Sequence, residues 1–244
     1  MTLNFPGRTA PVIFEREVDS TNTRLKAMAA QAADGTIITA GRQTEGRGRL
    51  GRSFASPDGG IYLSILLAPG GDLRRCMTLT PNAAIAVRRA LNDCCGVNAD
   101  IKWPNDLQLG GKKLCGILTE SVSAGGETKI IIGIGINLNT SPAAFPPELR
   151  GTACSILSET GNFTPPEKLL RALTAELDSM YTRWLADPAW SLDEYRAACI
   201  TLGQQVRIGE VCGKAVSVGS DFALYIGTGS GRIIPVTSGE VLAK

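Results

Sequence analysis

The sequence predicts an α+β protein in which a mixed central sheet with flanking helices is followed by a small all-β barrel. Helical and strand periodicities alternate over the first two hundred residues, but not in the regular strand–helix–strand order of a doubly wound sheet. After about Thr201 the helical period stops, and short β-like pieces separated by glycine-containing turns replace it. We therefore expect a main domain over residues 1–200 and a small β domain over residues 201–244.

The first half of the main domain shows two helices and two strands. The first helix is expected to stop at Asp34-Gly35, and two β-branched or apolar strands follow it at Thr36–Ala40 and Ile61–Leu67. The second helix begins with Thr80 as N-cap and Pro81 in its first turn, and it stops at Gly96. The apolar stripes of these helices are Leu25, Met28, Ala29 and Ala32, and Ala84, Val87, Leu91 and Cys94.

The second half adds three strands, around Val97–Trp103, Leu114–Ser121 and Lys129–Asn137, and a long helix. Thr164–Glu167 reads as a capping box that opens this helix. Its stripe is Leu170, Leu173, Leu177, Met180 and Trp184. The last 44 residues are too few to bury a comfortable core alone, so we expect them to pack against the main domain. Their β-like pieces are Gln205–Ile208, Ala215–Val218, Ala223–Ile226 and Arg232–Val236.

Composition excludes several classes of function. The 25 Lys+Arg and 23 Asp+Glu nearly balance, which is not typical of a protein that binds nucleic acid or membranes over its whole surface. The absence of histidine excludes Ser-His-Asp and Cys-His catalysis and every imidazole zinc site. The seven cysteines form no C-x-x-C pair, and neither a secretory signal nor a long apolar run is present. These features predict a cytoplasmic protein with reduced thiols, no resident metal and no membrane partner.

The segment Gly46–Arg52 (GRGRLGR), preceded by Arg42, alternates glycine with arginine. Such a sequence suits a mobile loop whose backbone approaches a ligand while guanidinium groups hold phosphate or carboxylate. A solvated surface loop or a Gly/Arg nucleic-acid tract is the alternative. The spacing matches neither the dinucleotide fingerprint nor the P-loop.

Two lysine-containing segments follow. In Ile101–Leu107 (IKWPNDL), Pro104 forces an extended Trp103, which places Lys102, Asn105 and Asp106 at a strand end where they can face a cavity. An ordinary turn with a core Trp is the alternative. In Lys112–Glu120, a glycine within a strand, Gly116, indicates close approach by a ligand or a backbone, although a basic edge strand explains the segment equally well.

Two further segments complete the candidate site. In Gly133–Asn139 (GIGINLN), alternating glycines such as Gly135 leave a slot on one strand face, and Asn137 offers a donor and an acceptor at its end. A bulge or a strand crossing is the alternative. Asp19–Asn22 precedes the first helix, and helix capping alone would explain it.

In this order and spacing, the segments DSTN, GRGRLGR, KWPNDL, KLCGIL and GIGINLN closely resemble the biotin protein ligase family, over about residues 12–244. The resemblance implies a class II aminoacyl-tRNA-synthetase-like catalytic domain with a C-terminal SH3-like domain. It also implies an ATP-dependent biotin–protein ligase that forms biotinyl-5′-AMP with Mg²⁺ and then transfers biotin to a lysine of a biotin carboxyl carrier protein. A site without histidine suits this chemistry, because adenylation needs positive charge rather than a protein nucleophile.

The resemblance also implies roles for individual residues. The biotin-binding residues would be Ser20, Thr21, Asn22, Gln43, Gly46, Arg47, Gly48, Arg49, Lys113 and Gly116. The ATP-binding residues would be Arg49, Arg52, Asn105, Lys113, Gly135 and Asn137. Lys113 and Arg49 would be catalytic in activation, and Lys102 and Asp106 in transfer to the incoming lysine.

The chain departs from the family pattern at Leu50, where many members have Arg, and at Phe54, where Trp is usual. Few residues precede the first motif, so we expect a monofunctional ligase without a helix-turn-helix domain or DNA binding. A homodimer is possible. The alternatives are a lipoate or octanoate ligase or transferase of the same fold, and a non-catalytic biotin- or nucleotide-binding protein.

Overall fold

The computed structural model describes residues 1–3, 5 and 7–243. Its main sheet has eight strands in the order β1-β2-β3-β4-β8-β7-β6-β5. Only β2 and β3 are parallel, and every other neighbouring pair is antiparallel. The predicted mixed sheet is therefore confirmed. The strands are β1 (Thr2–Leu3), β2 (Val12–Val18), β3 (Ile37–Gln43), β4 (Ile61–Leu67), β5 (Asp100–Lys102), β6 (Asp106–Leu109), β7 (Lys112–Ala124) and β8 (Glu127–Ile136).

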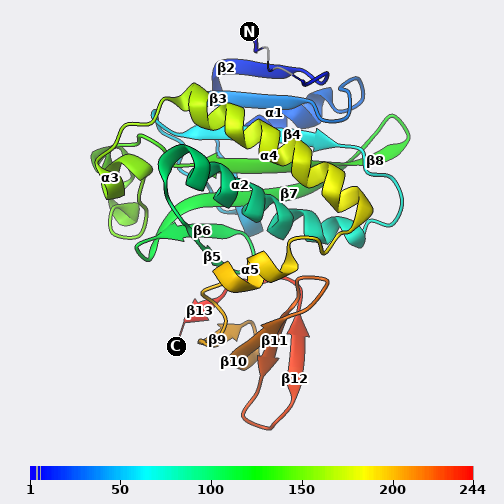
Figure 1. Cartoon of the computed structure of the whole chain (residues 1–244), viewed down its shortest axis with the longest axis vertical. Coiled ribbons are helices and arrows are strands. Elements are labelled where there is room, and N and C mark those ends of the chain that lie inside the picture. The colour runs from blue at the N-terminus through cyan, green and yellow to red at the C-terminus, as the bar shows by residue number, and fades with distance from the viewer. Residues whose placement is uncertain (4, 6, 244) are drawn as a thin grey trace.

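Helices cover both faces of this sheet. Figure 1 views the molecule from the side on which α2 and α4 lie across the sheet. The short helix α1 packs on the opposite face, where its Leu25 and Ala29 meet Ile38, Leu66 and Ile131 in a separate apolar cluster. Because side chains alternate across a strand, the glycines of β8 lie on the α1 face. The helices are α1 (Thr21–Met28), α2 (Leu79–Cys95), α3 (Ile156–Thr160), α4 (Pro166–Ala186) and α5 (Leu192–Ala198).

Helix bodies agree with the sequence better than helix ends do. The stripe of α4 from Leu170 to Trp184 is buried, and Gly96 caps α2 in the left-handed conformation at φ 66°. The predicted caps are wrong: α2 begins after Thr78, α4 begins after Pro165, and neither helix has a side-chain cap bond. The Thr80 hydroxyl instead donates to Thr119 Oγ1 (2.8 Å) on β7.

The first helix is also shorter than expected, since it ends at Met28 rather than near Asp34. The ammonium of Lys129, which lies on β8, takes up the free carbonyl oxygens of Ala29 (2.8 Å) and Ala32 (3.2 Å). A tertiary contact therefore satisfies the groups that another helical turn would have satisfied.

The C-terminal residues form a five-stranded antiparallel sheet in the order β12-β11-β10-β9-β13, with β12 and β13 at its edges. This sheet packs on the main domain as expected, because Val206, Ala215 and Leu224 belong to the same buried core as the main sheet. The indole of Trp103 donates to Phe222 O at 2.9 Å. The strands are β9 (Gln205–Ile208), β10 (Val211–Val218), β11 (Leu224–Gly227), β12 (Ile233–Val236) and β13 (Leu242–Ala243).

Candidate functional site

The predicted motifs meet at one cavity that reaches the α1 face of the main sheet, between the start of α1, the Gly/Arg loop and strands β7 and β8. The cavity is small, about 50 Å³. The predicted residues on its wall are Ser20, Thr21, Asn22, Gln43, Arg47, Gly48, Arg49, Asn105, Lys113, Gly116 and Gly135. Five segments separated by up to a hundred residues in sequence thus converge on one place.

One end of the cavity is a network of neutral polar groups. The Thr21 amide and hydroxyl both donate to Gln43 Oε1 (2.8 and 3.1 Å), and the Gln43 amide donates to Ser56 Oγ (2.8 Å). The hydroxyl of Ser64, which is fully buried, lies 2.7 Å from Thr21 Oγ1. Such a network fixes side-chain orientation and offers donors and acceptors to a small neutral polar group such as a urea.

Asp19–Asn22 does more than cap α1. Ser20 stands at the N-cap but makes no side-chain cap bond. Asn22 is buried over Gly133, where an added Cβ would lie 2.2 Å from Asn22 Oδ1. The Asn22 amide accepts from Ser64 Oγ (2.6 Å) and donates to Glu120 Oε2 (2.8 Å). Gly133 therefore provides the space for Asn22, and Glu120 holds it.

The Gly/Arg loop folds back over the cavity as a small hairpin. Phe54 N–H donates to Gly46 O (2.8 Å), and Gly48 N–H donates to Arg52 O (2.7 Å). Gly46 has no room for a side chain, since a Cβ would lie 2.3 Å from Phe54 O. At the loop tip Leu50 is exposed and has φ 56°, a conformation that is strained for a leucine.

Arg49 anchors the loop to the KWPNDL segment. Its NH1 donates to Asn105 Oδ1 at 2.7 Å, and the Asn105 amide donates onward to Ile117 O at 2.9 Å. Burial lowers the pKa of Arg49, while the carboxylate of Asp106 acts in the opposite direction. Arginine stays charged in proteins, so a partly desolvated cation borders the cavity.

Lys113 and Asp106 form an ion pair, with Nζ 2.7 Å from Oδ1. The Lys113 ammonium also lies 5.8 Å from the centre of the Phe54 ring. Two residues that were expected to serve different steps therefore contact each other directly. Asn105 Nδ2 lies 3.2 Å from the same Asp106 oxygen, which links the pair to Arg49.

The space left by Gly116 and Gly135 is filled by the ring of Phe54. A Cβ on Gly135 would lie 2.4 Å from Phe54 Cε1, and one on Gly116 would lie 2.9 Å from Cε2. The expectation that these glycines leave open room for a ligand is thus met only if the Phe54 ring moves. The sequence predicts no position for this aromatic side chain, and its place over both glycines follows from the tertiary fold.

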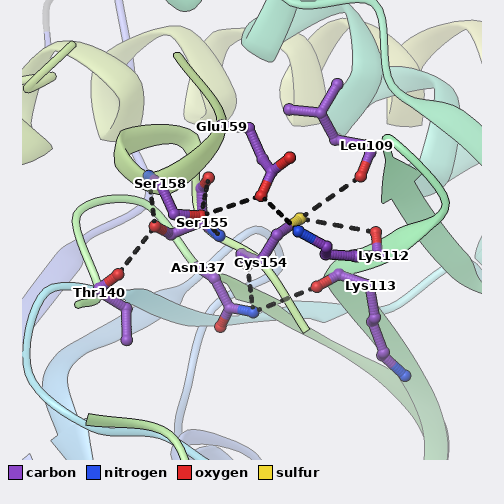
Figure 2. Close-up of polar contacts among 9 residues, drawn as sticks. All are labelled: Leu109, Lys112, Lys113, Asn137, Thr140, Cys154, Ser155, Ser158 and Glu159. Carbon is purple, nitrogen blue, oxygen red and sulfur yellow. Dashed lines mark hydrogen bonds and ion pairs between the residues drawn. The ribbon is translucent and has the colours of Figure 1, made fainter. Parts of the chain in front are cut away.

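Asn137 lies beneath the cavity rather than on its wall. Figure 2 shows its side-chain nitrogen directed at the carbonyl oxygens of Cys154 (2.9 Å) and Lys113 (3.5 Å). Its Oδ1 is buried and has no hydrogen-bond partner among the described residues. A buried acceptor without a partner is costly, and in the present conformation this atom does not border the cavity.

A second cavity of about 140 Å³ adjoins the first and carries the remaining predicted side chains, Arg52, Lys102 and Asp106. Arg49 and Lys113 line both cavities. Glu240, from the C-terminal segment, closes the second cavity and forms a bidentate ion pair with Arg52. This pairing lowers the pKa of Glu240 and raises that of Arg52. The excess of cations suits a polyphosphate.

A third and larger cavity, about 530 Å³, opens on the other side of Arg49. Its apolar wall includes Leu73, Met77, Trp103 and Phe222, and the first two are half exposed. Along it, residues 118–124 of β7 pair only with β8 within the described chain, because the ladder with β6 ends at Gly116 and the backbone groups of Ile117 bond to Asn105. The groove therefore contains an apolar wall and an unpaired strand edge.

Four contributors to the site were not expected from the sequence: Ser56, Ser64, Glu120 and Glu240. Ser64 is the polar residue in the otherwise apolar IYLSILL strand, a signal that was available. Ser56, Glu120 and Glu240 carry no such signal, since single polar or acidic side chains are ordinary surface residues. In residues 1–3, 5 and 7–243, His, Cys, Asp and Glu side chains form no group of three or more that could hold a metal ion.

Comparison with known proteins identifies the family of the chain. The model of the Biotin/lipoate A/B protein ligase family matches residues 14–137. The bifunctional ligase/repressor BirA of Bacillus subtilis is 34% identical over 82% of this chain, and the chain spans 64% of the length of that relative. The biotin–[acetyl-CoA-carboxylase] ligase of Paracoccus denitrificans is 36% identical over 79% of this chain and 80% of its own.

Solved structures show the same fold. The biotin protein ligase from Aquifex aeolicus in complex with biotin and ATP superposes with a TM-score of 0.82 at 31% identity, covering 96% of this chain and 98% of the other. The fold is therefore that of the biotin protein ligases, a mixed sheet flanked by helices with a small C-terminal antiparallel sheet.

Proposed function

Because the chain belongs to the Biotin/lipoate A/B protein ligase family, we propose that it is an ATP-dependent biotin–protein ligase. The observation that carries the proposal is the position of Arg49, which lines all three cavities. The reaction has three reactants, and each cavity has the chemistry that one of them needs. The reacting atoms would meet beside the Arg49 guanidinium.

The first cavity would take biotin. Its neutral polar end, built from Thr21, Gln43 and Asn22, matches the donor and acceptor groups of a ureido ring. Its other end places the Lys113 ammonium where the carboxylate of the acid would lie. At its present volume of about 50 Å³ the pocket is too small for the whole molecule, so binding requires movement of the Phe54 ring off Gly116 and Gly135.

The second cavity would take the phosphates of ATP. Arg49, Arg52, Lys102 and Lys113 surround it with four positive charges against Asp106 and Glu240. Mg²⁺ would enter with the nucleotide as part of the substrate, because Mg²⁺ is commonly held by phosphates, waters and only one or two carboxylates. Asn137 would contact the nucleotide only after a rearrangement at the end of β8, because its Oδ1 is buried and lines none of the three cavities.

Activation would proceed by attack of a biotin carboxylate oxygen on the α-phosphorus, with the bond to the β-phosphate breaking and pyrophosphate leaving. Lys113 and Arg49 would balance the negative charge that gathers between the two anions. The loop from Gly46 to Arg52 would then cover the mixed anhydride and keep water away from it.

Transfer would proceed by attack of a neutral lysine amine on the biotinyl carbonyl, releasing AMP and one proton. A free lysine has a pKa of about 10.4, so the acceptor must lose a proton on binding. Asp106 is the carboxylate closest to Lys113, at 2.7 Å, and could accept that proton once the nucleotide phosphate has drawn Lys113 away. Lys102 would neutralise the departing AMP.

The third cavity would receive the acceptor, a biotin carboxyl carrier domain such as that of acetyl-CoA carboxylase. The groove is wide and largely apolar, and its β7 edge offers free backbone groups to an added strand. A homodimer stays a prediction.

A cytoplasmic location is proposed from the cysteines, all seven of which are free thiols in the structure. In the part of the chain that the structure describes, no helix has the length and apolar character to cross a membrane.

The decisive experiment is to incubate the protein with ATP, Mg²⁺, biotin and an apo carrier domain and to weigh the carrier. We expect a mass gain of one biotinyl group, which requires every component. Lipoate and octanoate, offered alone and in competition with biotin, test the other branch of the family. Absence of a biotinyl adduct would contradict the proposed function, and preferential labelling with lipoate would reassign the substrate.

A further inference from the structure

Glu120 connects two parts of the site that the proposed reaction uses separately. One carboxylate oxygen, Oε2, accepts from Asn22 Nδ2 at 2.8 Å, and the other, Oε1, lies 3.3 Å from Arg47 NH2. Asn22 belongs to the buried wall of the biotin pocket, whereas Arg47 belongs to the loop that would cover the ligand. Among the described residues, this is a direct side-chain link between the wall and the loop.

We propose that Glu120 is a positioning residue that couples occupancy of the biotin pocket to closure of the Gly/Arg loop. The proposal rests on the proposed ligase function. A ligand that settles against Asn22 holds Glu120 in place, and Glu120 in turn holds Arg47 over the ligand. Glu120 itself takes no part in bond making or breaking.

The two contacts of Glu120 differ in strength: the hydrogen bond from Asn22 is stronger than the ion pair with Arg47. This difference suits a loop that must open and close. Asn22 is buried, packs directly over Gly133 and accepts from Ser64 Oγ at 2.6 Å, so it is held on the inner side of the link. The Arg47 side chain is 47% exposed and that of Glu120 is 22% exposed, so their ion pair is hydrated and weak. Because the contact between Asn22 and Glu120 is partly buried and the ion pair between Glu120 and Arg47 is weak, the loop can open for substrate and close again without rearranging the pocket.

The contact is independent of the other anchor of the loop. Arg49 is held by Asn105 at 2.7 Å, a residue of the KWPNDL segment on the nucleotide side. Glu120 lies on β7 beyond the point where β6 stops, on the wall of the third cavity, and from there it contacts Arg47 at the rim of the first cavity. The loop thus has two side-chain anchors, one on either side of Gly48, and they can be tested separately.

The test measures how well the enzyme retains biotinyl-5′-AMP. Wild type, Glu120→Gln and Glu120→Ala are given ATP, Mg²⁺, biotin, the carrier domain and an excess of an unrelated lysine-rich protein. The readout is bystander label per pyrophosphate released, measured with and without the carrier, so that it depends neither on the overall rate nor on carrier docking at the third cavity, which Glu120 also lines. Glu120→Gln keeps an acceptor for Asn22 but loses the charge opposite Arg47, and we expect leakage to rise by up to about fivefold, the range for a half-exposed ion pair. Glu120→Ala should leak more, because it also releases Asn22.

A second set of variants separates positioning from a general structural effect. In an Arg47→Ala background the Glu120→Gln substitution should have no further effect, whereas Arg47→Lys should preserve part of the retention. Glu17→Gln is the matched control, because it breaks a comparable exposed pair, Glu17 with Arg42 at 3.6 Å, outside the cavities. Arg49→Gly, which removes the other anchor, is the positive control for leakage.

Equal leakage in wild type and Glu120→Gln, or additive effects of Glu120→Gln and Arg47→Ala, would overturn the coupling while leaving the ligase assignment intact. Failure of the wild type to label the carrier would instead reject the proposed function, and the coupling with it. The two failures are therefore distinguishable in one experiment.

Discussion

The ammonium of Lys113 lies 2.7 Å from the carboxylate of Asp106, and Asn105 contacts the same carboxylate while also holding Arg49. The groups proposed for activation and for transfer thus form one connected network before any substrate binds. Substrate phosphate would compete with Asp106 for Lys113, so the first step of the reaction would itself expose the carboxylate needed for the second.

Replacing Lys113 tests the first step. We expect Lys113→Ala to slow the pyrophosphate burst by about 10²–10³-fold, the usual cost of losing one preorganised donor to developing charge. Lys113→Arg keeps the positive charge and should retain part of the burst. Single-turnover release of pyrophosphate measures both variants, and an unchanged burst in Lys113→Ala would remove this residue from activation.

Replacing Asp106 tests the second step. Asp106→Asn keeps the size of the side chain and a hydrogen bond toward Lys113 but removes the proton acceptor. Transfer from preformed adenylate to the carrier should fall by about 10²-fold or more, the contribution expected of a positioned base. The burst should fall less. A burst that falls as much as transfer would show that Asp106 acts only by orienting Lys113.

The apolar groove can be tested at its rim. Met77 is half exposed, so Met77→Glu should fold normally and disturb docking of the acceptor domain. We expect the KM for the carrier to rise at least tenfold, while turnover with hydroxylamine as a small acceptor is retained. Phe163→Glu, at an exposed apolar position outside the groove, is the control. A rise in KM confined to Phe163→Glu would place the docking surface elsewhere.

The contact between Arg52 and Glu240 predicts a dependence on pH. Hydrogen bonding to Arg52 lowers the pKa of Glu240 below its ordinary value, so the contact is complete above the ordinary carboxyl pKa and is lost as the pH falls through the lowered one. Protection of the amides in residues 46–52 against exchange, after correction for the intrinsic pH dependence, should therefore fall in acid. Glu240→Gln should show the faster exchange already at neutral pH, and identical profiles for the two proteins would contradict the role of this contact.

The overlap between Phe54 and the glycine slot predicts a coupled pair of substitutions. Gly135→Ala would bring a methyl group within 2.4 Å of Phe54 Cε1, so the ring must move or the strand must shift. We expect Gly135→Ala to lower the melting temperature in the wild-type background and to do so much less with Phe54→Ala. Calorimetry of the two single variants and the double variant measures the coupling.

The local order of the chain could be predicted well where one physical rule dominates. Ile61–Leu67 is a strand with the expected bounds because seven consecutive apolar or small residues can be buried on both faces, and Gly96 ends α2 because its φ is positive. The caps at Thr80 and Thr164 could not be predicted, since both threonines bond elsewhere: Thr80 to Thr119, and Thr164 through its backbone to Asn139. The sequence analysis does not predict strand β2, because its sequence, VIFEREV, combines charged and apolar residues and the strand is only partly buried.

The candidate site shows the same division. Five sequence segments predicted most of its walls, because each contains a residue type with a specific chemical use. What could not be predicted is which side chains of those segments contact one another. The pairing of Lys113 with Asp106, the support of Asn22 by Glu120 and the ring of Phe54 over Gly135 all depend on strands that are distant in sequence.

The indole of Trp103 donates to the Phe222 carbonyl, and the ring of Phe222 meets Tyr195 edge-on with centroids 5.2 Å apart. These residues come from the turn between β5 and β6, from the loop before β11 and from α5. The C-terminal sheet therefore packs against the main domain through contacts that depend on these three residues. A chimaera that exchanged the C-terminal strands for those of a relative would have to carry matching residues at all three positions, because a mismatch there would be transmitted to Lys102 and Asn105 on either side of Trp103 and Pro104.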